Sequence, residues 1–171
     1  MIRLKDRQLA LTNKRITTSV NNLPIPNSQA NDICSALTGI SDLLIEYEKL
    51  VLVTSTRECS WPVAQQGFLQ YCQRFNRSYT ILECAATEIP SPGTAYFTLN
   101  DADLASLIAK TNMFGYKLGQ DIGLLAFDDS PIKKLMNLTV VTTTLPSGST
   151  SQQHPVNSCN NTFEIIRRAS L

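Results

Sequence analysis

The chain has 171 residues, a net charge of +1, 43% hydrophobic residues and 17% charged residues, values typical of a globular protein with one or two domains. They exclude a protein that holds nucleic acid by charge alone, because its 15 basic residues are scattered along the sequence. No apolar run approaches the roughly 20 residues that a membrane-spanning helix needs. Met1 to Arg7 carries charges without a following apolar block, so we expect no secretion signal and a cytoplasmic location.

The cysteine and histidine pattern does not indicate a metal site. The five cysteines and the single histidine, His154, have none of the usual zinc-site spacings. The seven glycines are dispersed, so no phosphate-binding loop is indicated. Cys59 would need a neighbouring base to act as a nucleophile, and the sequence offers none close by. We therefore expect reduced, mostly buried thiols, with no metal, no cofactor and no catalytic residue.

The first elements in chain order are a strand, a helix and a second strand. Residues 15–22 are rich in β-branched side chains, which favour a strand. Residues 31–48 have amphipathic helical spacing, and Asn31 or Asp32 would cap this helix. Residues 50–54 form a continuous apolar run, typical of a strand buried on both faces of a parallel sheet. The expected apolar stripe of the helix is Ile33, Leu37, Ile40, Leu43, Leu44 and Tyr47.

A further helix and strand follow, and the connection after them is short. Residues 62–75 predict a helix with Pro62 in its first turn, where the missing N–H costs nothing. Residues 78–84 predict a strand. The next nine residues, 85–93, include two prolines and are fewer than the dozen or so that a parallel crossover usually needs. The chain is therefore expected either to cross without a helix or to form an abridged lobe. The core candidates of the helix are Val63, Phe68, Tyr71 and Cys72.

Two apolar runs that end abruptly in polar side chains organise the second half of the sequence. One ends in Asn100 and Asp101, and the other ends in Asp128 and Asp129. A segment of helical spacing, stopped by Gly115, lies between them. This order predicts parallel strands, and ligands bind at the carboxyl ends of strands in open parallel sheets. The runs are 94–99 and 122–127, and the helix is 102–114, with Leu104, Leu107, Ile108 and Met113 on its apolar face.

Each of these polar residues has two interpretations. A side chain at the end of a strand can contact a ligand, or it can cap the helix that follows. We expect Asp128 to accept hydrogen bonds from a ligand and Asp129 to cap the helix predicted at 131–136. For Asn100 and Asp101 both roles stay open. The remaining predicted elements are a strand or hinge crossing at 138–144, a loop or disordered segment at 146–161 and a terminal strand at 163–171.

The order of these motifs resembles the effector-binding domain of lac/galactose-repressor-type (LacI/GalR) transcriptional regulators. In that family a strand ending in Asn-Asp is followed by a helix, a Gly-x-x-(Pro/Gly)-x-Asp turn and a strand ending in Gly-(Phe/Tyr)-Asp-Asp. Residues 95–129 follow this order, and Gly67-Phe68 and Arg168-Ala169-Ser170 resemble two further family motifs. The sequence departs from the family at Ala126, where glycine is usual, at Gly119, where proline is usual, and at Ala64, where the family has an effector-binding arginine.

The resemblance implies an α/β fold with an open, mostly parallel sheet flanked by helices, in one or more periplasmic-binding-protein-like lobes. It implies a small-molecule effector, a sugar or a related compound, and a homodimer that contacts DNA only through a headpiece absent from this chain. We expect a remnant of a first lobe plus a helix at 1–50, the main effector-binding lobe at 50–145, and a polar loop with a terminal strand at 146–171. The residues expected to bind the effector are Asp128, Asn100, Asp101, Trp61, Arg57 and Gln65.

Three alternatives remain open at this point. The first is an effector-less dimerisation module of the same fold, which the replaced arginine and the short connection at 85–93 make credible. The second is a periplasmic-type sugar-binding protein, which the missing export segment disfavours. The third is a small α/β enzyme, which the missing catalytic motifs disfavour.

Overall fold

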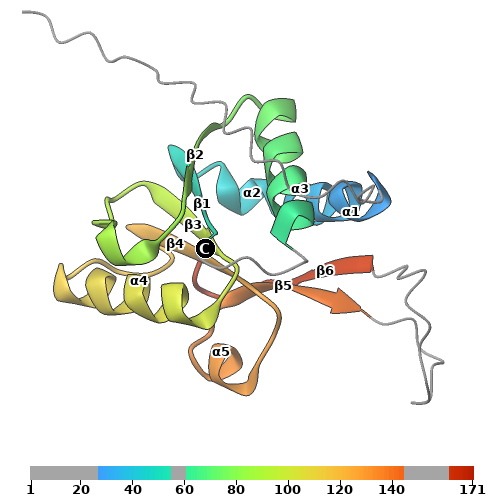
Figure 1. Ribbon diagram of the computed structural model, residues 1–171. Coiled ribbons are helices and arrows are strands. Elements are labelled where there is room, and N and C mark those ends of the chain that lie inside the picture. The colour runs from blue at the N-terminus through green and yellow to red at the C-terminus, as the bar shows by residue number, and fades with distance from the viewer. Residues whose placement is uncertain (1–26, 55–60, 145–161) are drawn as a thin grey trace, which may run out of the picture.

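The computed structural model describes residues 27–54, 61–144 and 162–171, which form a six-stranded sheet between two layers of helices (Figure 1). The strand order is β2-β1-β3-β4-β5-β6. Strands β1 to β5 run parallel, and β6 is antiparallel to β5. The predicted open, mostly parallel sheet is therefore confirmed. The strands are β1 Lys49–Val53, β2 Ser78–Leu82, β3 Thr94–Thr98, β4 Ile122–Phe127, β5 Thr139–Thr144 and β6 Thr162–Ile166. The helices are α1 Asn27–Thr38, α2 Ser41–Leu44, α3 Trp61–Arg74, α4 Asp101–Met113 and α5 Pro131–Leu135, with a 3-10 turn, η1, at Ala85–Thr87.

The alternation of side chains along each strand divides the core into two halves. Leu50 and Leu52 of β1 pack in the half that contains α1, α2 and α3. Val51 and Val53 of the same strand pack in the half that contains α4. Both halves are buried, as expected for parallel strands that carry helices on both faces. The apolar runs read in the sequence are therefore central strands, and Figure 1 shows the two helical layers on either side of them.

The helix predicted at 31–48 is two helices. Helix α1 begins at Asn27, so Asn31 and Asp32 lie inside it and not at its cap. It ends at Thr38, and α2 starts after Gly39, the residue type that favours helix interiors least apart from proline. The predicted apolar stripe is nevertheless buried except for Leu43, which is partly buried, and Leu37 and Leu44 belong to the same core cluster. The two residues between α1 and α2 leave the apolar side chains of both helices facing the same core. The spacing of these side chains therefore does not indicate the break.

The short connection between β2 and β3 crosses the sheet without an α-helix. Its only regular element is η1, and both flanking strands pair in parallel with β1. Two side chains of α4 hold it in place. The Asp103 carboxylate accepts a hydrogen bond from Ala85 N–H at 3.0 Å. The Lys110 ammonium donates to the carbonyl oxygens of Ala85, Ala86 and Glu88 at 2.8, 2.6 and 2.7 Å. These side chains replace the packing that a crossover helix would supply.

The carboxyl-terminal residues close the sheet and explain one departure from the family pattern. Ser170 Oγ donates to the Leu124 carbonyl at 2.6 Å and accepts from Thr139 N–H at 2.7 Å, which joins the chain end to β4 and β5. Gly119 has a φ of +76°, and a Cβ there would overlap the Ala169 carbonyl oxygen. A proline, whose φ is fixed near −65°, is incompatible with this conformation.

Some predictions lie outside the described residues, namely the strand at 15–22 and the loop at 146–161. Within the described ranges, no helix combines the length and hydropathy required to cross a bilayer.

Of the three cysteines that the structure describes, Cys34 and Cys72 are buried free thiols and Cys84 is an exposed one. Met113, predicted to lie on the apolar face of α4, is instead 73% exposed in the last turn of the helix.

Candidate functional site

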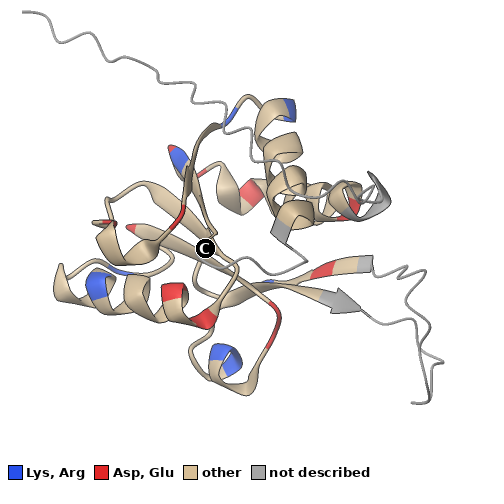
Figure 2. Cartoon of the chain, in the orientation of Figure 1, with Lys and Arg blue, Asp and Glu red and all other residues tan. Residues whose placement is uncertain are grey.

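The two polar strand ends predicted from the sequence lie at the same edge of the sheet. Strands β3 and β4 are parallel neighbours, with Thr98 in register with Ala126. Asn100 and Asp128 therefore follow adjacent strands at their carboxyl ends, where open parallel sheets bind ligands. Figure 2 shows acidic residues at the start of α4 and in the β4–α5 connection, with basic residues on α5 beside them.

Asn100 is the N-cap of α4. Its backbone is extended, and its side-chain oxygen accepts a hydrogen bond from Asp103 N–H at 2.8 Å. Its amide nitrogen donates to the Asp103 carboxylate. This arrangement satisfies one of the free N–H groups of the first helical turn. Of the two roles open for Asn100, the structure shows the cap, and contact with an effector stays a proposal.

Asp128 has an unusual backbone conformation with hydrogen bonds on both sides. Its φ is +56°, in the left-handed region that residues other than glycine rarely adopt. Its N–H donates to the Val141 carbonyl at 2.7 Å, and its carbonyl accepts from Lys133 Nζ at 3.0 Å. Its side chain is exposed. Asp and Asn adopt this region more readily than other non-glycine residues, and Asn76 and Asn137 share it here, so the contact of Asp128 with an effector stays a proposal.

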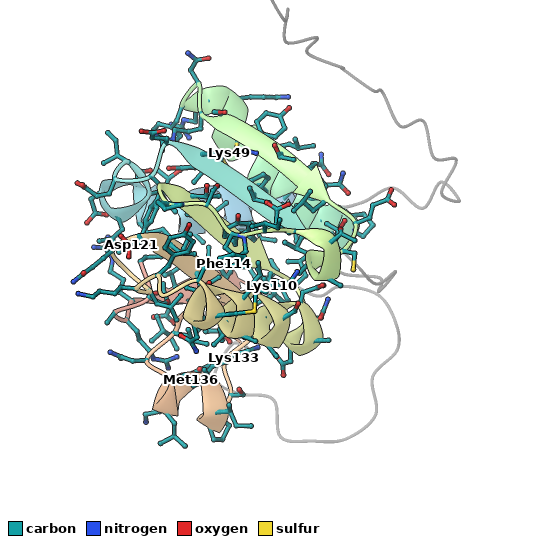
Figure 3. The ribbon with its side chains drawn as sticks, turned by 90° about the vertical axis from the view of Figure 1, so that its left-hand side faces the viewer. Lys49, Lys110, Phe114, Asp121, Lys133 and Met136 are labelled. Carbon is teal, nitrogen blue, oxygen red and sulfur yellow. The ribbon has the colours of Figure 1, made fainter. Side chains whose placement is uncertain are left out.

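Lys133 connects the two polar strand ends. Its ammonium forms an ion pair with Asp101 Oδ1 at 2.8 Å and donates to the Phe127 carbonyl at 2.7 Å. The bond to the Asp128 carbonyl is its third. The Asp101 carboxylate, a predicted effector contact, is 75% exposed and pairs with this lysine. Lys133 itself is 6% exposed. Figure 3 shows its position between α4 and α5.

The prediction that Asp129 caps α5 is wrong. The N-cap is Ser130, whose Oγ accepts from Lys133 N–H at 3.3 Å. Asp129 instead forms a two-pronged ion pair with Arg168, at 2.9 and 2.7 Å. The hydrogen bonds from Arg168 lower the pKa of the Asp129 carboxyl, and the same bonds raise the pKa of Arg168. Arg168 also donates to the Leu138 carbonyl at 2.8 Å, so the pair fixes the strand end and does not leave it open for a ligand.

The other predicted contacts are less closely defined by the structure. Arg57 lies outside the described residues. Trp61 opens α3, the helix that follows β1, but its side chain is outside what the structure describes. Gln65 is half-buried on the second turn of that helix. Ala64, at the family's arginine position, is 1% exposed and belongs to the core, so this position faces inward.

Sequence reasoning missed two residues of this edge, Lys133 and Arg168. In the sequence each belongs to a pair of basic residues, Lys133-Lys134 and Arg167-Arg168, which indicates no contact with the strand ends. The resemblance of Arg168-Ala169-Ser170 to a family motif was a signal for Arg168, but it named no partner. Among the described residues, no group of three or more His, Cys, Asp or Glu side chains is arranged to hold a metal ion.

The fold and this edge together define a lobe of the periplasmic-binding-protein-like class. No family model matches the sequence, and a search of curated proteins finds no relative. Solved structures do match. A sugar-binding transcriptional regulator of the LacI family from Escherichia coli, complexed with phosphate, has a TM-score of 0.63 and 15% identity over 84% of this chain and 61% of that chain.

Two further structures show the same fold. The Escherichia coli transcriptional repressor ascG has a TM-score of 0.59 and 13% identity over 84% of this chain and 62% of its own. A periplasmic binding protein/LacI transcriptional regulator from Alkaliphilus metalliredigens, complexed with D-xylulofuranose, has a TM-score of 0.51 and 16% identity over 67% and 48%. The fold is therefore that of LacI-type effector-binding domains, and this chain spans about 61% of the length of the first of these regulators.

Proposed function

We propose that the chain is a small-molecule-sensing and dimerisation module of a LacI-type transcriptional regulator. The observation that carries this proposal is the exposed, left-handed Asp128 beside the start of α4, at the carboxyl edge of parallel strands. An ionised carboxylate makes stronger hydrogen bonds to ligand hydroxyls than a neutral acceptor does. A sugar or related polyol is the proposed effector. The proposed location is the cytoplasm, and DNA is contacted only through a separate headpiece.

The sensing role requires a second surface to cover the ligand. The chain corresponds to about 61% of the E. coli regulator, and the described residues build one sheet. The proposed effector is held between this sheet edge and a second surface, and it acts by binding two arrangements of these surfaces with different affinity. Asn100, Asp101, Trp61, Arg57 and Gln65 remain the proposed partners of Asp128 in this contact.

Dimerisation is proposed to use the surface of α4 and α5. Three apolar side chains of the α5 segment are exposed, Ile132 by 68%, Leu135 by 87% and Met136 by 43%. Ile132 and Met136 line an apolar groove of about 370 Å³ between the two helices, and Leu135 is exposed on the same segment. Projecting side chains next to a groove suit a two-fold interface, in which each copy inserts into the other. The groove is lined by Asp101, Leu104, Ala105, Ile108, Ala109, Ser130, Ile132, Lys133 and Met136.

A second candidate function is an effector-less dimerisation module of the same fold. Two observations favour it. The polar groups of Asn100 and Asp101 have structural partners, as a helix cap and in an ion pair. Ala64, which stands at the family's effector-binding arginine, is buried. In this alternative the carboxyl edge has lost its ligand and the α4–α5 surface carries the function.

A thermal-shift experiment separates the two functions. The protein is tested with D-ribose, D-xylulose, maltose and inorganic phosphate. A ligand at a hundred times its dissociation constant stabilises the fold by about 2.7 kcal/mol. Asp128→Asn is the matched variant, because asparagine also tolerates a positive φ but carries no charge. A shift that shrinks in Asp128→Asn supports the sensor. No shift with any sugar, in a protein that dimerises, supports the effector-less module.

The dimer is tested by sedimentation velocity. Ile132→Glu places a charge on the proposed interface and is expected to increase the monomer fraction. Ile89→Glu is the control, because Ile89 is equally exposed, at 68%, but lies in the segment before β3 and does not line the groove. Equal effects of the two substitutions would contradict the proposed interface.

A further inference from the structure

Helix α5 is attached to the rest of the molecule in an unusual way. It has five residues, and the only buried one is Lys133. The large apolar side chains of this segment, Ile132, Leu135 and Met136, are exposed. Amphipathic helices normally bury their apolar residues against the core. Here the buried side chain is a lysine, and Figure 3 shows Lys133 where α5 meets the body of the protein, with Met136 farther along the same segment.

The ammonium of Lys133 uses all its hydrogen-bonding capacity at the sheet edge. It contacts Asp101 Oδ1 and the carbonyl oxygens of Phe127 and Asp128, at 2.8, 2.7 and 3.0 Å. A lysine ammonium has three donors, so none remains for a ligand. The side chain is 7% exposed, which excludes water from most of it. Lys133 therefore does not bind a ligand directly, and its effect on one must act through the groups that it holds.

The backbone of Asp128 depends on this contact. Asp adopts a φ of +56° more readily than most residues, and the hydrogen bonds of the two neighbouring peptides stabilise it in this conformation. The Asp128 N–H is held by the Val141 carbonyl, and its carbonyl is held by Lys133. Without the second bond the peptide after Asp128 loses a restraint on the side of its carbonyl, and the direction of the Asp128 side chain is less closely fixed. The same ammonium also forms the ion pair with Asp101 of α4, so Asp101 and the Asp128 carbonyl share one partner.

We infer that Lys133 is a positioning residue that fixes Asp128 and couples the ligand edge to the outer surface of α5. Lys133 and Asp101 also line the groove next to Ile132 and Met136. A second copy of the chain packed on Ile132 and Met136 would contact α5, and the one buried side chain of α5, Lys133, orients Asp128. Association at α5 and ligand binding at Asp128 then influence each other reciprocally. This inference rests on the proposed function and names the connection between its two surfaces.

The test measures the Asp128 backbone directly and needs no ligand. The full chain is labelled with ¹⁵N, and the Asp128 amide resonance is compared between wild type, Lys133→Met and Asp101→Asn. Methionine has a similar length without the charge. Asp101→Asn removes the negative charge that pairs with the ammonium and keeps an amide oxygen there, so it is the milder change and gives a result if Lys133→Met does not fold. Lys134→Met is the control, because Lys134 is an exposed neighbour on the same helix.

The expected result is that Lys133→Met and Asp101→Asn both shift the Asp128 amide and that Lys134→Met does not. In wild type the same resonance moves as protein concentration is raised through the dimerisation range. Lys133→Met weakens self-association about tenfold, within the usual range of coupling between two sites.

Three results would overturn the inference. An Asp128 amide unchanged in both variants removes the positioning role. An Asp128 amide that does not follow self-association removes the coupling, and so does a protein that stays monomeric at all concentrations. The absence of a thermal shift with any sugar contradicts the sensing function instead, and it leaves the amide measurement to decide the role of Lys133.

Discussion

The short crossover between β2 and β3 depends on Lys110, and we expect Lys110→Met to lower stability by about 2 kcal/mol. The ammonium donates to three carbonyl oxygens of the connection. The contact with Ala86 is exposed, so water replaces it after the substitution and its loss costs little. The contacts with Ala85 and Glu88 are partly buried, and each is worth about 1 kcal/mol in net terms.

The assay is urea unfolding at pH 7 followed by circular dichroism, with a matching thermal scan. For a protein of this size, a loss of about 2 kcal/mol lowers Tm by roughly 4 to 8 °C. Lys117→Met is the control, because Lys117 is an exposed lysine beyond the end of α4 and its side chain makes no described hydrogen bond to η1. If Lys110→Met loses less than about 0.5 kcal/mol, the range of ordinary surface substitutions, the connection is held by other contacts and the reasoning is refuted.

Three further predictions concern individual residues. Because the pKa of Asp129 is lowered in the folded state, its contribution to stability is complete above the unfolded pKa near 4 and is lost as the pH falls through the lower folded value. Tm measured from pH 6 to pH 2.5 should therefore decline less in Asp129→Asn than in wild type. Gly119→Ala should lower the free energy of unfolding by about 2 kcal/mol or more in urea unfolding, because the new Cβ meets both a positive φ and an overlap with Ala169. Gly115→Ala has a similar φ and open space around it, so it should cost about 1 kcal/mol, and equal losses would contradict the role of the overlap. Burial raises the pKa of Cys72 to about 12, so at pH 8 a variant that keeps only Cys72 should react with a thiol reagent far more slowly than one that keeps only the exposed Cys84; similar rates would contradict this.

Local sequence features were sufficient for the parallel sheet. A continuous apolar run such as Leu50 to Val53 is typical of a strand buried on both faces, and β1 is such a strand. The abrupt change to Asn100 and Asp128 marked the carboxyl ends of two strands, and parallel pairing places such ends at one edge. The predicted single helix at 31–48 was wrong because the spacing of its apolar residues does not change at the break at Gly39.

The hydrogen-bond and ion-pair partners of the polar side chains could not be predicted from the sequence. Asp129 next to Ser130 and Pro131 has the pattern of a helix cap, yet its carboxylate binds Arg168, 39 residues further along the chain. Which side chain caps the helix and which forms the ion pair depends on the position of β6, and no local pattern encodes that position. The partners of Lys133 could not be predicted from local sequence either. A lysine on a short helix with apolar neighbours predicts an exposed charge, whereas the structure buries it because three acceptors converge on it.

The central claim is that the carboxyl edge beside Asp128 binds a small polar effector, and a ¹H–¹⁵N titration with D-ribose, D-xylulose and maltose tests it most directly. The account predicts that at least one sugar shifts amide resonances at 100 and 127–129, which do not line the α4–α5 groove, and that Asp128→Asn reduces the affinity by about fivefold or more. Resonances that move only along the α4–α5 groove, or none that move with any of these sugars, would contradict it.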